Sequence, residues 1–275
     1  MRLVAMTGLA ALVFLVSPLP GARSDDAAEK LLLATCKLAN DASTGTSTVV
    51  LLTQGDGKPR RFAITANHVL EQMAGDSCVL VSRAQVEGGG FQRLEIRVPI
   101  RANGQRTWLK HPGHDLAALP LPDSPNIEAL PFDCLPTPEQ LAGFHAGDAV
   151  RVAVFPERAE ANSIGFAMLR GGSIASYPLV PATAHPMFLV DTMSWPGDSG
   201  GPVMHDSLRA PNGGPLLIGV VRGMRNVTDT VKESRFVERR THYPLGIAEV
   251  LHAALVREMI PDTAPAQPPP DQQAK

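Results

Sequence analysis

Both the fold and the chemistry of this chain are constrained most by one stretch, Pro196-Gly197-Asp198-Ser199-Gly200-Gly201-Pro202-Val203. A hydroxyl nucleophile must project from a tight turn, and backbone N–H groups must point at the oxygen that becomes negative. Glycines on both sides of Ser199 permit the unusual backbone angles of such a turn. The octet predicts Ser199 as a nucleophile, with the N–H groups of Gly197 and Ser199 as its oxyanion hole. The alternative is a hairpin turn that carries an exposed serine.

A serine hydroxyl is a weak nucleophile unless a base accepts its proton. His68 is the candidate base, in Ile64-Thr65-Ala66-Asn67-His68-Val69-Leu70, where it follows a β-branched strand. The alternative is a histidine with a purely structural place in the core or at the surface.

The base in turn needs a carboxylate that fixes its tautomer and stabilises the imidazolium. Asp115 is the candidate, in His114-Asp115-Leu116-Ala117-Ala118-Leu119, directly before an apolar strand. Asp76 and Asp123 are rival candidates, but neither is followed immediately by an apolar strand. An aspartate that merely ends a loop is the remaining interpretation of Asp115.

The segment His111-Pro112-Gly113-His114-Asp115 also contains good zinc ligands. A third strong ligand is not evident and Pro-Gly separates the histidines, so we favour a loop that carries Asp115. The sequence therefore predicts neither a metal nor a cofactor.

Short apolar segments separated by turn residues predict an all-β fold. A proline-rich crossing at residues 122–147 divides them into two sets of about six strands. The expected strands are 46–53, 61–65, 78–82, 92–100 and 116–121 before the crossing, and 149–155, 165–169, 173–177, 187–191, 202–205 and 216–222 after it. We expect residues 226–240 to form a long surface loop, 249–260 an amphipathic helix and 261–275 a disordered tail.

The first 24 residues are predicted to be an export signal. A basic start at Arg2 precedes the apolar run 3–16, prolines follow, and Ala22-Arg23-Ser24 offers small residues for cleavage. The alternative, an uncleaved membrane anchor, requires a longer apolar run. We expect a secreted or periplasmic protein without stable membrane insertion after cleavage.

The amino-acid composition limits the classes of molecule that this chain is expected to bind. The 275-residue chain has a formal net charge of −2, which argues against a basic nucleic-acid-binding face. Its cysteines are Cys36, Cys78 and Cys134. Two interpretations stay open: one disulfide with a leftover thiol, or three small buried apolar residues.

Three motifs together resemble those of trypsin-like (chymotrypsin-fold) serine peptidases. They are Thr65-Ala66-Asn67-His68, Asp115-Leu116-Ala117 and Gly197-Asp198-Ser199-Gly200-Gly201-Pro202, in that family's chain order of His, Asp, Ser. The resemblance implies two six-stranded antiparallel β-barrels packed face to face, with the active site between them and a C-terminal helix. It implies a first barrel at 25–121 and a second at 148–260.

The chain departs from that family in several respects, and no cysteine flanks His68 closely enough for the family's disulfide around the base. No Ile-Val-Gly-Gly segment is present to supply the new N-terminus that pairs with the aspartate before the serine, so Asp198 must have another partner. The chain is more similar to bacterial members that are active as synthesised, without an appended peptide-binding domain.

The resemblance also implies where substrate binds. It places Met193 at the base of the primary pocket, where it offers no counter-charge for basic side chains. The strand that pairs with an extended substrate ends at Arg222. Met193 as a core residue and Arg222 as a solvated side chain are the alternatives.

These observations predict an exported serine endopeptidase that acts on peptide or protein substrates. Two alternatives are a catalytically silent binding protein of the same fold and an esterase that uses the same triad.

Overall fold

The computed structural model describes residues 25–53, 58–122 and 126–260. The predicted export signal, the predicted tail and Asp123 lie outside the described residues. Within those ranges, no helix combines the length and the apolar character needed to cross a membrane.

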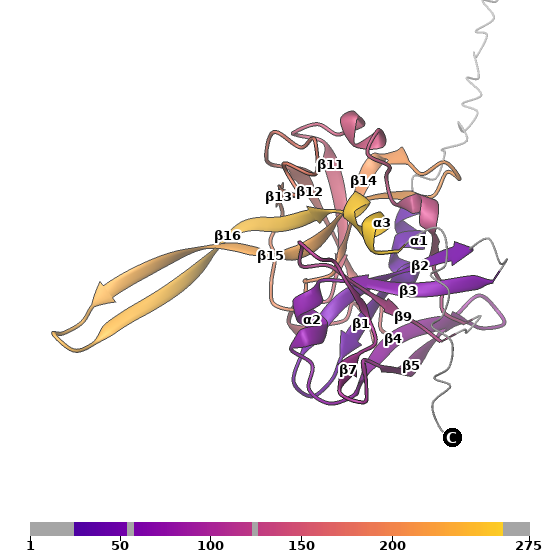
Figure 1. Cartoon of the computed structure of the whole chain (residues 1–275), viewed down its shortest axis with the longest axis horizontal. Coiled ribbons are helices and arrows are strands. Elements are labelled where there is room, and N and C mark those ends of the chain that lie inside the picture. Colours follow the sequence, from indigo (N-terminus) through magenta and orange to yellow (C-terminus); the bar gives the residue numbers. More distant parts are fainter. Residues whose placement is uncertain (1–24, 54–57, 123–125, 261–275) are drawn as a thin grey trace, which may run out of the picture.

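The N-terminal half is built on one antiparallel sheet with the strand order β5-β4-β1-β2-β3-β9-β8 (Figure 1). Its strands are β1 (Thr35–Ala39), β2 (Thr44–Thr53), β3 (Pro59–Thr65), β4 (Ser77–Gln85), β5 (Phe91–Pro99), β8 (Leu109–Lys110) and β9 (Ala117–Pro120). β10 (Leu130–Pro131) pairs in parallel with β2, and β6 (Arg101–Ala102) pairs with β7 (Gln105–Arg106). The recorded strand pairs do not close this sheet, so the closed first barrel of the prediction is not shown.

The C-terminal half is a closed six-stranded barrel, as predicted, with the order β11-β12-β13-β16-β15-β14. Its strands are β11 (Ala149–Val154), β12 (Met168–Ile174), β13 (Met187–Asp191), β14 (Pro202–Arg209), β15 (Pro215–Lys232) and β16 (Glu238–His252). Val152, Phe188, Val203 and Ile218 belong to the cluster that fills it. The predicted C-terminal helix is present as a small element, η4 (Ala253–Leu255) followed by α3 (Val256–Met259).

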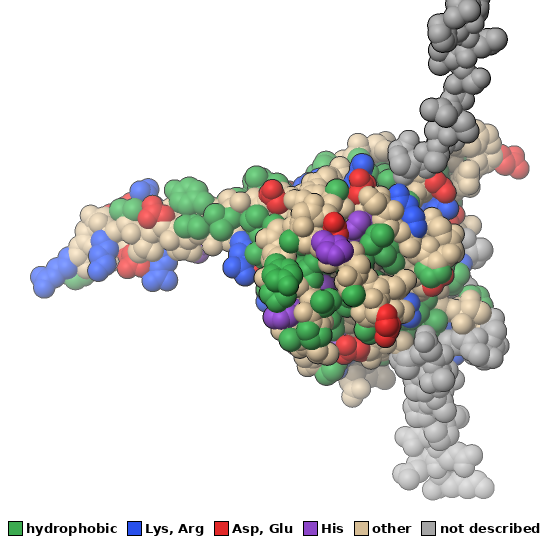
Figure 2. All heavy atoms as spheres, turned by 90° about the horizontal axis from the view of Figure 1, so that it is seen from above, with side chains coloured by type: hydrophobic (Ala, Val, Ile, Leu, Met, Phe, Trp, Pro, Cys, Tyr) green, Lys and Arg blue, Asp and Glu red, His purple; other side chains and the backbone are tan. Residues whose placement is uncertain are grey.

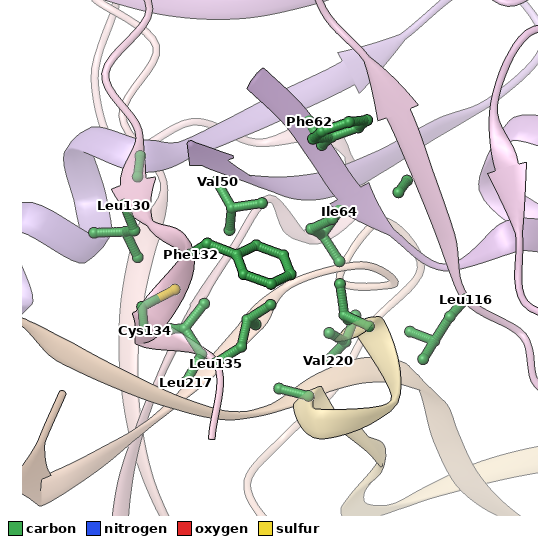
Figure 3. Packing of buried hydrophobic residues seen from close by; sticks show 14 of the residues in the cluster. Val50, Phe62, Ile64, Leu116, Leu130, Phe132, Cys134, Leu135, Leu217 and Val220 are labelled. Carbon is green, nitrogen blue, oxygen red and sulfur yellow. The ribbon is translucent and has the colours of Figure 1, made fainter. Parts of the chain in front are cut away.

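A shared hydrophobic core joins the two halves. Val50 and Ile64 of the first sheet belong to the same buried cluster as Leu217 and Val220 of β15, and Figure 3 shows these side chains around Phe132. Phe132 lies in η1 (Phe132–Cys134), which is followed by η2 (Gln140–Gly143). The proline-rich crossing is therefore packed into the core in part, rather than running only over the surface.

An N-terminal helix, α1 (Asp25–Ala34), was not predicted. Ala27 and Leu31, four residues apart, lie on its buried face in the shared core. Its C-terminal carbonyls are held by Arg83 of β4, which is buried and donates to Leu32 at 3.1 Å and Leu33 at 2.7 Å. A cation at the negative end of a helix dipole stabilises that end, and here it also attaches the helix to the sheet.

Two predictions for the last third of the chain are wrong. Residues 226–240 are not a loop, because β15 and β16 continue past the barrel as a two-stranded arm (Figure 1). Residues 249–260 are not one helix, because β16 runs to His252. Val250 faces the barrel core and Leu251 the shared core. A strand buried on both faces has consecutive apolar residues, which also match a helical spacing.

No disulfide joins the three cysteines, which are all free and buried. Burial raises the pKa of each thiol, that of Cys78 to about 11. Of the two interpretations of the sequence, three buried apolar residues is the one shown.

His252 gives the fold a defined sensitivity to acid. It is 1% exposed, its ring centroid lies 4.8 Å from that of Phe188, and burial lowers its pKa to about 4. Because the unfolded chain binds a proton between about pH 6.5 and 4 and the folded chain does not, stability falls as the pH drops through this window. The expected loss is about 3 kcal/mol in total.

Chemical unfolding between pH 7 and 4 measures this loss. The His252→Phe variant should show a flatter dependence on pH than wild type, whereas His145→Gln, which changes an exposed ring, should follow wild type. Equal pH dependence in wild type and His252→Phe contradicts the assignment.

Candidate active site

Strand pairing brings His68 and Asp115 together. β3 ends just before α2 (Asn67–Glu71), β9 begins just after Asp115, and Thr65 lies opposite Ala117 in the sheet. Nδ1 of His68 lies 2.7 Å from Oδ2 of Asp115, and the backbone N–H of His68 donates to Oδ1 at 2.9 Å. These two bonds fix the orientation of the carboxylate relative to the ring.

The electrostatics keep Asp115 ionised. Burial raises its pKa, but the hydrogen bonds from His68 together with the charges of His68 and Arg222 outweigh burial, so the pKa is lower than the usual value. An ionised Asp115 accepts the proton on Nδ1, which leaves Nε2 of His68 as the free basic nitrogen. Asp76, the rival that lies within the described residues, uses its backbone carbonyl to accept the N–H groups of Ile100 and Arg101.

The Ser199 turn is held between the two halves. The backbone N–H of Thr46 in β2 donates to the carbonyl of Ser199 at 2.9 Å, and the hydroxyl of Thr46 donates to that of Gly197 at 2.8 Å. On the other side, the N–H of Gly200 donates to Val221 of β15 at 2.7 Å. The turn therefore has a bonded neighbour in each half.

Gly197 and Gly200 are required by the geometry of this turn. Their φ angles are +97° and +88°, in the region that side chains disfavour. A Cβ atom at Gly197 would lie 2.4 Å from the carbonyl of Phe155, and one at Gly200 would lie 2.0 Å from that of Thr46. A side chain at either position would push the turn off its neighbours.

Two amides of the turn are left for a ligand. The N–H groups of Asp198, Gly200 and Gly201 donate to backbone carbonyls within the protein. By contrast, among the described residues no acceptor is recorded for the N–H groups of Gly197 and Ser199. These are the two amides that an oxyanion hole at this turn needs.

Ser199 and His68 line one cavity of about 360 Å³, together with Ser43, Gln72 and Arg158. The hydroxyl of Ser199 donates to the carbonyl of Arg222 at 3.1 Å, not to the His68 ring. Proton transfer to His68 therefore requires the hydroxyl to exchange this bond for one to Nε2.

The sequence predicted a partner for Asp198 without identifying it, and that partner is Arg170. Asp198 is 1% exposed, and burial raises its pKa. Its Oδ2 accepts from Arg170 of β12 at 2.7 Å and from the N–H of Trp195 at 2.9 Å. Arg170 also donates to the carbonyl of Met193 at 2.7 Å, so one side chain fixes both ends of the segment that precedes Ser199.

The two predicted substrate-binding residues lie near this site in different settings. Met193 is 46% exposed, so the alternative of a core residue is wrong. Arg222 bonds Glu249 at 2.9 Å and lies 3.8 Å from Oδ2 of Asp115. Arg222 is therefore tied to the aspartate that holds His68, which excludes a merely solvated side chain. Glu249 was not predicted in this role, because no local motif marks it.

The metal interpretation of residues 111–115 finds no support in the geometry. Nδ1 of His111 accepts the N–H groups of Gly113 and His114, and Nε2 faces Glu258 at 3.2 Å. Across the part of the chain that the structure describes, no group of three or more His, Cys, Asp or Glu side chains could hold a metal ion.

No protein-family model matches this chain, and a search of curated proteins finds no match.

Replacing Arg170 with Met tests its place beneath the turn. The change leaves the Asp198 carboxylate buried without its cation, which should lower the free energy of unfolding by about 3 kcal/mol. The Arg170→Lys variant should recover part of this loss. The double variant Arg170→Met with Asp198→Asn should recover most of it, because no buried charge then remains.

Arg151→Met is the matched control, since Arg151 lies on the neighbouring strand and its ion pair with Asp206 is exposed. Its expected cost in chemical unfolding is about 0.5 kcal/mol. Equal losses for Arg170→Met and Arg151→Met contradict the assignment.

Proposed function

We propose that this chain is an exported serine endopeptidase of the trypsin-like (chymotrypsin-fold) class. Ser199 is the nucleophile, His68 the general base and Asp115 the residue that orients the base. One observation carries the proposal. The 2.7 Å bond between His68 and Asp115 sets the ring on the cavity that Ser199 also lines.

The reaction proceeds through an acyl-enzyme. His68 takes the proton of Ser199 at Nε2 as the serine oxygen attacks a peptide carbonyl, and the N–H groups of Gly197 and Ser199 stabilise the oxyanion. His68 then donates that proton to the leaving amine as the C–N bond breaks. A water molecule, deprotonated by His68, attacks the ester and restores Ser199.

The same proposal treats the first sheet as the counterpart of the first barrel, at 25–121, and the closed barrel as the second, at 148–260. The buried cluster that includes Ile64 and Val220 supports face-to-face packing with the site between the halves. Export to the periplasm or the exterior rests on the predicted signal in residues 1–24.

Under this proposal, the protein needs no activation by cleavage of a precursor. In the class, the aspartate before the serine needs a cationic partner, and here Arg170 of β12 supplies that cation from within the chain. The oxyanion turn is therefore supported without a newly released N-terminus.

A fluorophosphonate probe tests the nucleophile, because it reacts only with an activated serine. Wild-type protein should be labelled on Ser199. Ser199→Ala should not be labelled, although it should unfold at the same denaturant concentration as wild type. Asp115→Asn should lower kcat by about 10⁴-fold, because it disturbs the tautomer of His68. Ser207→Ala, on β14, is the matched control and should label as wild type does.

Folded wild-type protein that is never labelled overturns the enzyme assignment and favours the binding protein. In that case, the bond from Ser199 to the Arg222 carbonyl is the resting contact of an inactive serine. Labelled protein that hydrolyses nitrophenyl esters but no member of a peptide library is an esterase.

A further inference from the structure

The arm formed by β15 and β16 stands clear of the barrel (Figures 1 and 2). The two strands pair from Asn226 opposite Pro244 to Lys232 opposite Glu238. On the side toward Ser199, β14 pairs with β15 only up to Val220, and Val221 is bonded to Gly201. From residue 222 to 232, this edge of β15 has no neighbouring strand within the described chain. Such an edge is a template for another extended chain.

One face of the arm carries three exposed apolar side chains, with Asp229 between two of them. Val227 lies opposite Tyr243, and Val231 is on the same face because side chains alternate along a strand. These three side chains are 42–53% exposed. The opposite face carries Thr228, which bonds His242 at 2.8 Å, and other polar residues. A two-stranded hairpin is marginal by itself, and a third strand paired at its edge stabilises it and extends the face that carries Val227 and Val231.

The charge of the arm selects the partner. Residues 223–246 contain five Lys or Arg and three Asp or Glu, whereas the whole chain has 25 and 27. Glu233 pairs with Arg239, Glu238 with Arg240, and Arg225 with Glu249 outside the arm, so the pairs inside the arm leave its excess of basic residues unchanged. The arm is therefore a basic element on an acidic body, which favours a partner with net negative charge.

The unpaired edge begins at the proposed nucleophile, since Ser199 bonds the carbonyl of Arg222. The leaving amine must lie at His68, whose cavity is lined by residues 42–44, Gln72 and Arg158 and by no residue of β15. The acyl half of the substrate is therefore the half that can follow β15.

We propose that the arm, through the edge of β15 from 226 to 232 and the face that carries Val227 and Val231, extends the substrate site beyond the residues next to the scissile bond and binds the far part of the acyl half of an extended polypeptide substrate. The occupant is an unfolded, acidic segment of about ten residues with apolar side chains at alternate positions. This inference rests on the proposed function and narrows its substrate class.

Two fluorogenic peptides with the same residues around the scissile bond test it. One has about four residues before that bond, and the other about twelve, with Val and Glu alternating. For wild type, KM should be about tenfold lower for the long peptide, because each added cross-strand pair contributes to binding.

Three variants locate the effect. Val227→Ser with Val231→Ser, and an arm in which residues 227–243 are replaced by Asn-Gly, should bring the ratio of kcat/KM for long to short peptide close to one. The shortened arm covers the case in which the double serine variant fails to fold. Thr228→Ser with Thr230→Ser, on the polar face, is the matched control and should keep the wild-type ratio.

The outcomes separate the two proposals. If wild type cleaves neither peptide, the proposed function fails. If it cleaves both equally well, or if the shortened arm keeps the preference, the exosite alone is overturned. Light scattering that shows a wild-type dimer, and a monomer after arm shortening, assigns the apolar face to a second copy of the chain and also overturns the exosite.

Discussion

Thr46 of β2 is bonded to a turn that lies 151 residues later in the chain, and the rest of the site depends on that contact. Its hydroxyl holds the Gly197 carbonyl, and its backbone N–H holds the Ser199 carbonyl. The peptide units that carry the N–H groups of Gly197 and Ser199 are held separately, because the carbonyl of Pro196 accepts the N–H of Glu157 and the carbonyl of Asp198 accepts that of Gly201. The absence of side chains at Gly197 and Gly200 allows the turn to approach β2 this closely.

Ion pairs hold both the serine turn and the aspartate that is bonded to His68. Arg170 neutralises the buried Asp198, and Glu249 holds Arg222 beside Asp115. Both arginines come from barrel strands, so the barrel supplies the cations and the first half supplies His68 and Asp115. Because a buried carboxylate left without its cation is costly, loss of Arg170 should destabilise the fold more than loss of the half-exposed Arg222.

Local patterns in the sequence predicted most strands and the serine turn, because each depends on neighbouring residues. The closeness of His68 to Asp115 was expected instead from the needs of a serine nucleophile and from the resemblance of the three motifs. Arg170 was missed because its partner lies across the sheet, and nothing in the residues around it indicates a buried carboxylate. α1 did have a signal in Ala27 and Leu31, but it directly follows the predicted export signal, where a new helix is easily overlooked. The arm was mistaken for a loop because its exposed strands lack the apolar alternation of a buried one.

Because Thr46 bonds the serine turn, the candidate site lies at the interface between the two halves. His68 and Asp115 come from one side of it, and the serine with its glycines from the other. Neither half alone contains the whole candidate site, so a nascent chain cannot assemble it until its last third has been synthesised and docked. Under the proposed function, the order of synthesis acts as a safeguard, because a partly made chain cannot cut itself or its neighbours.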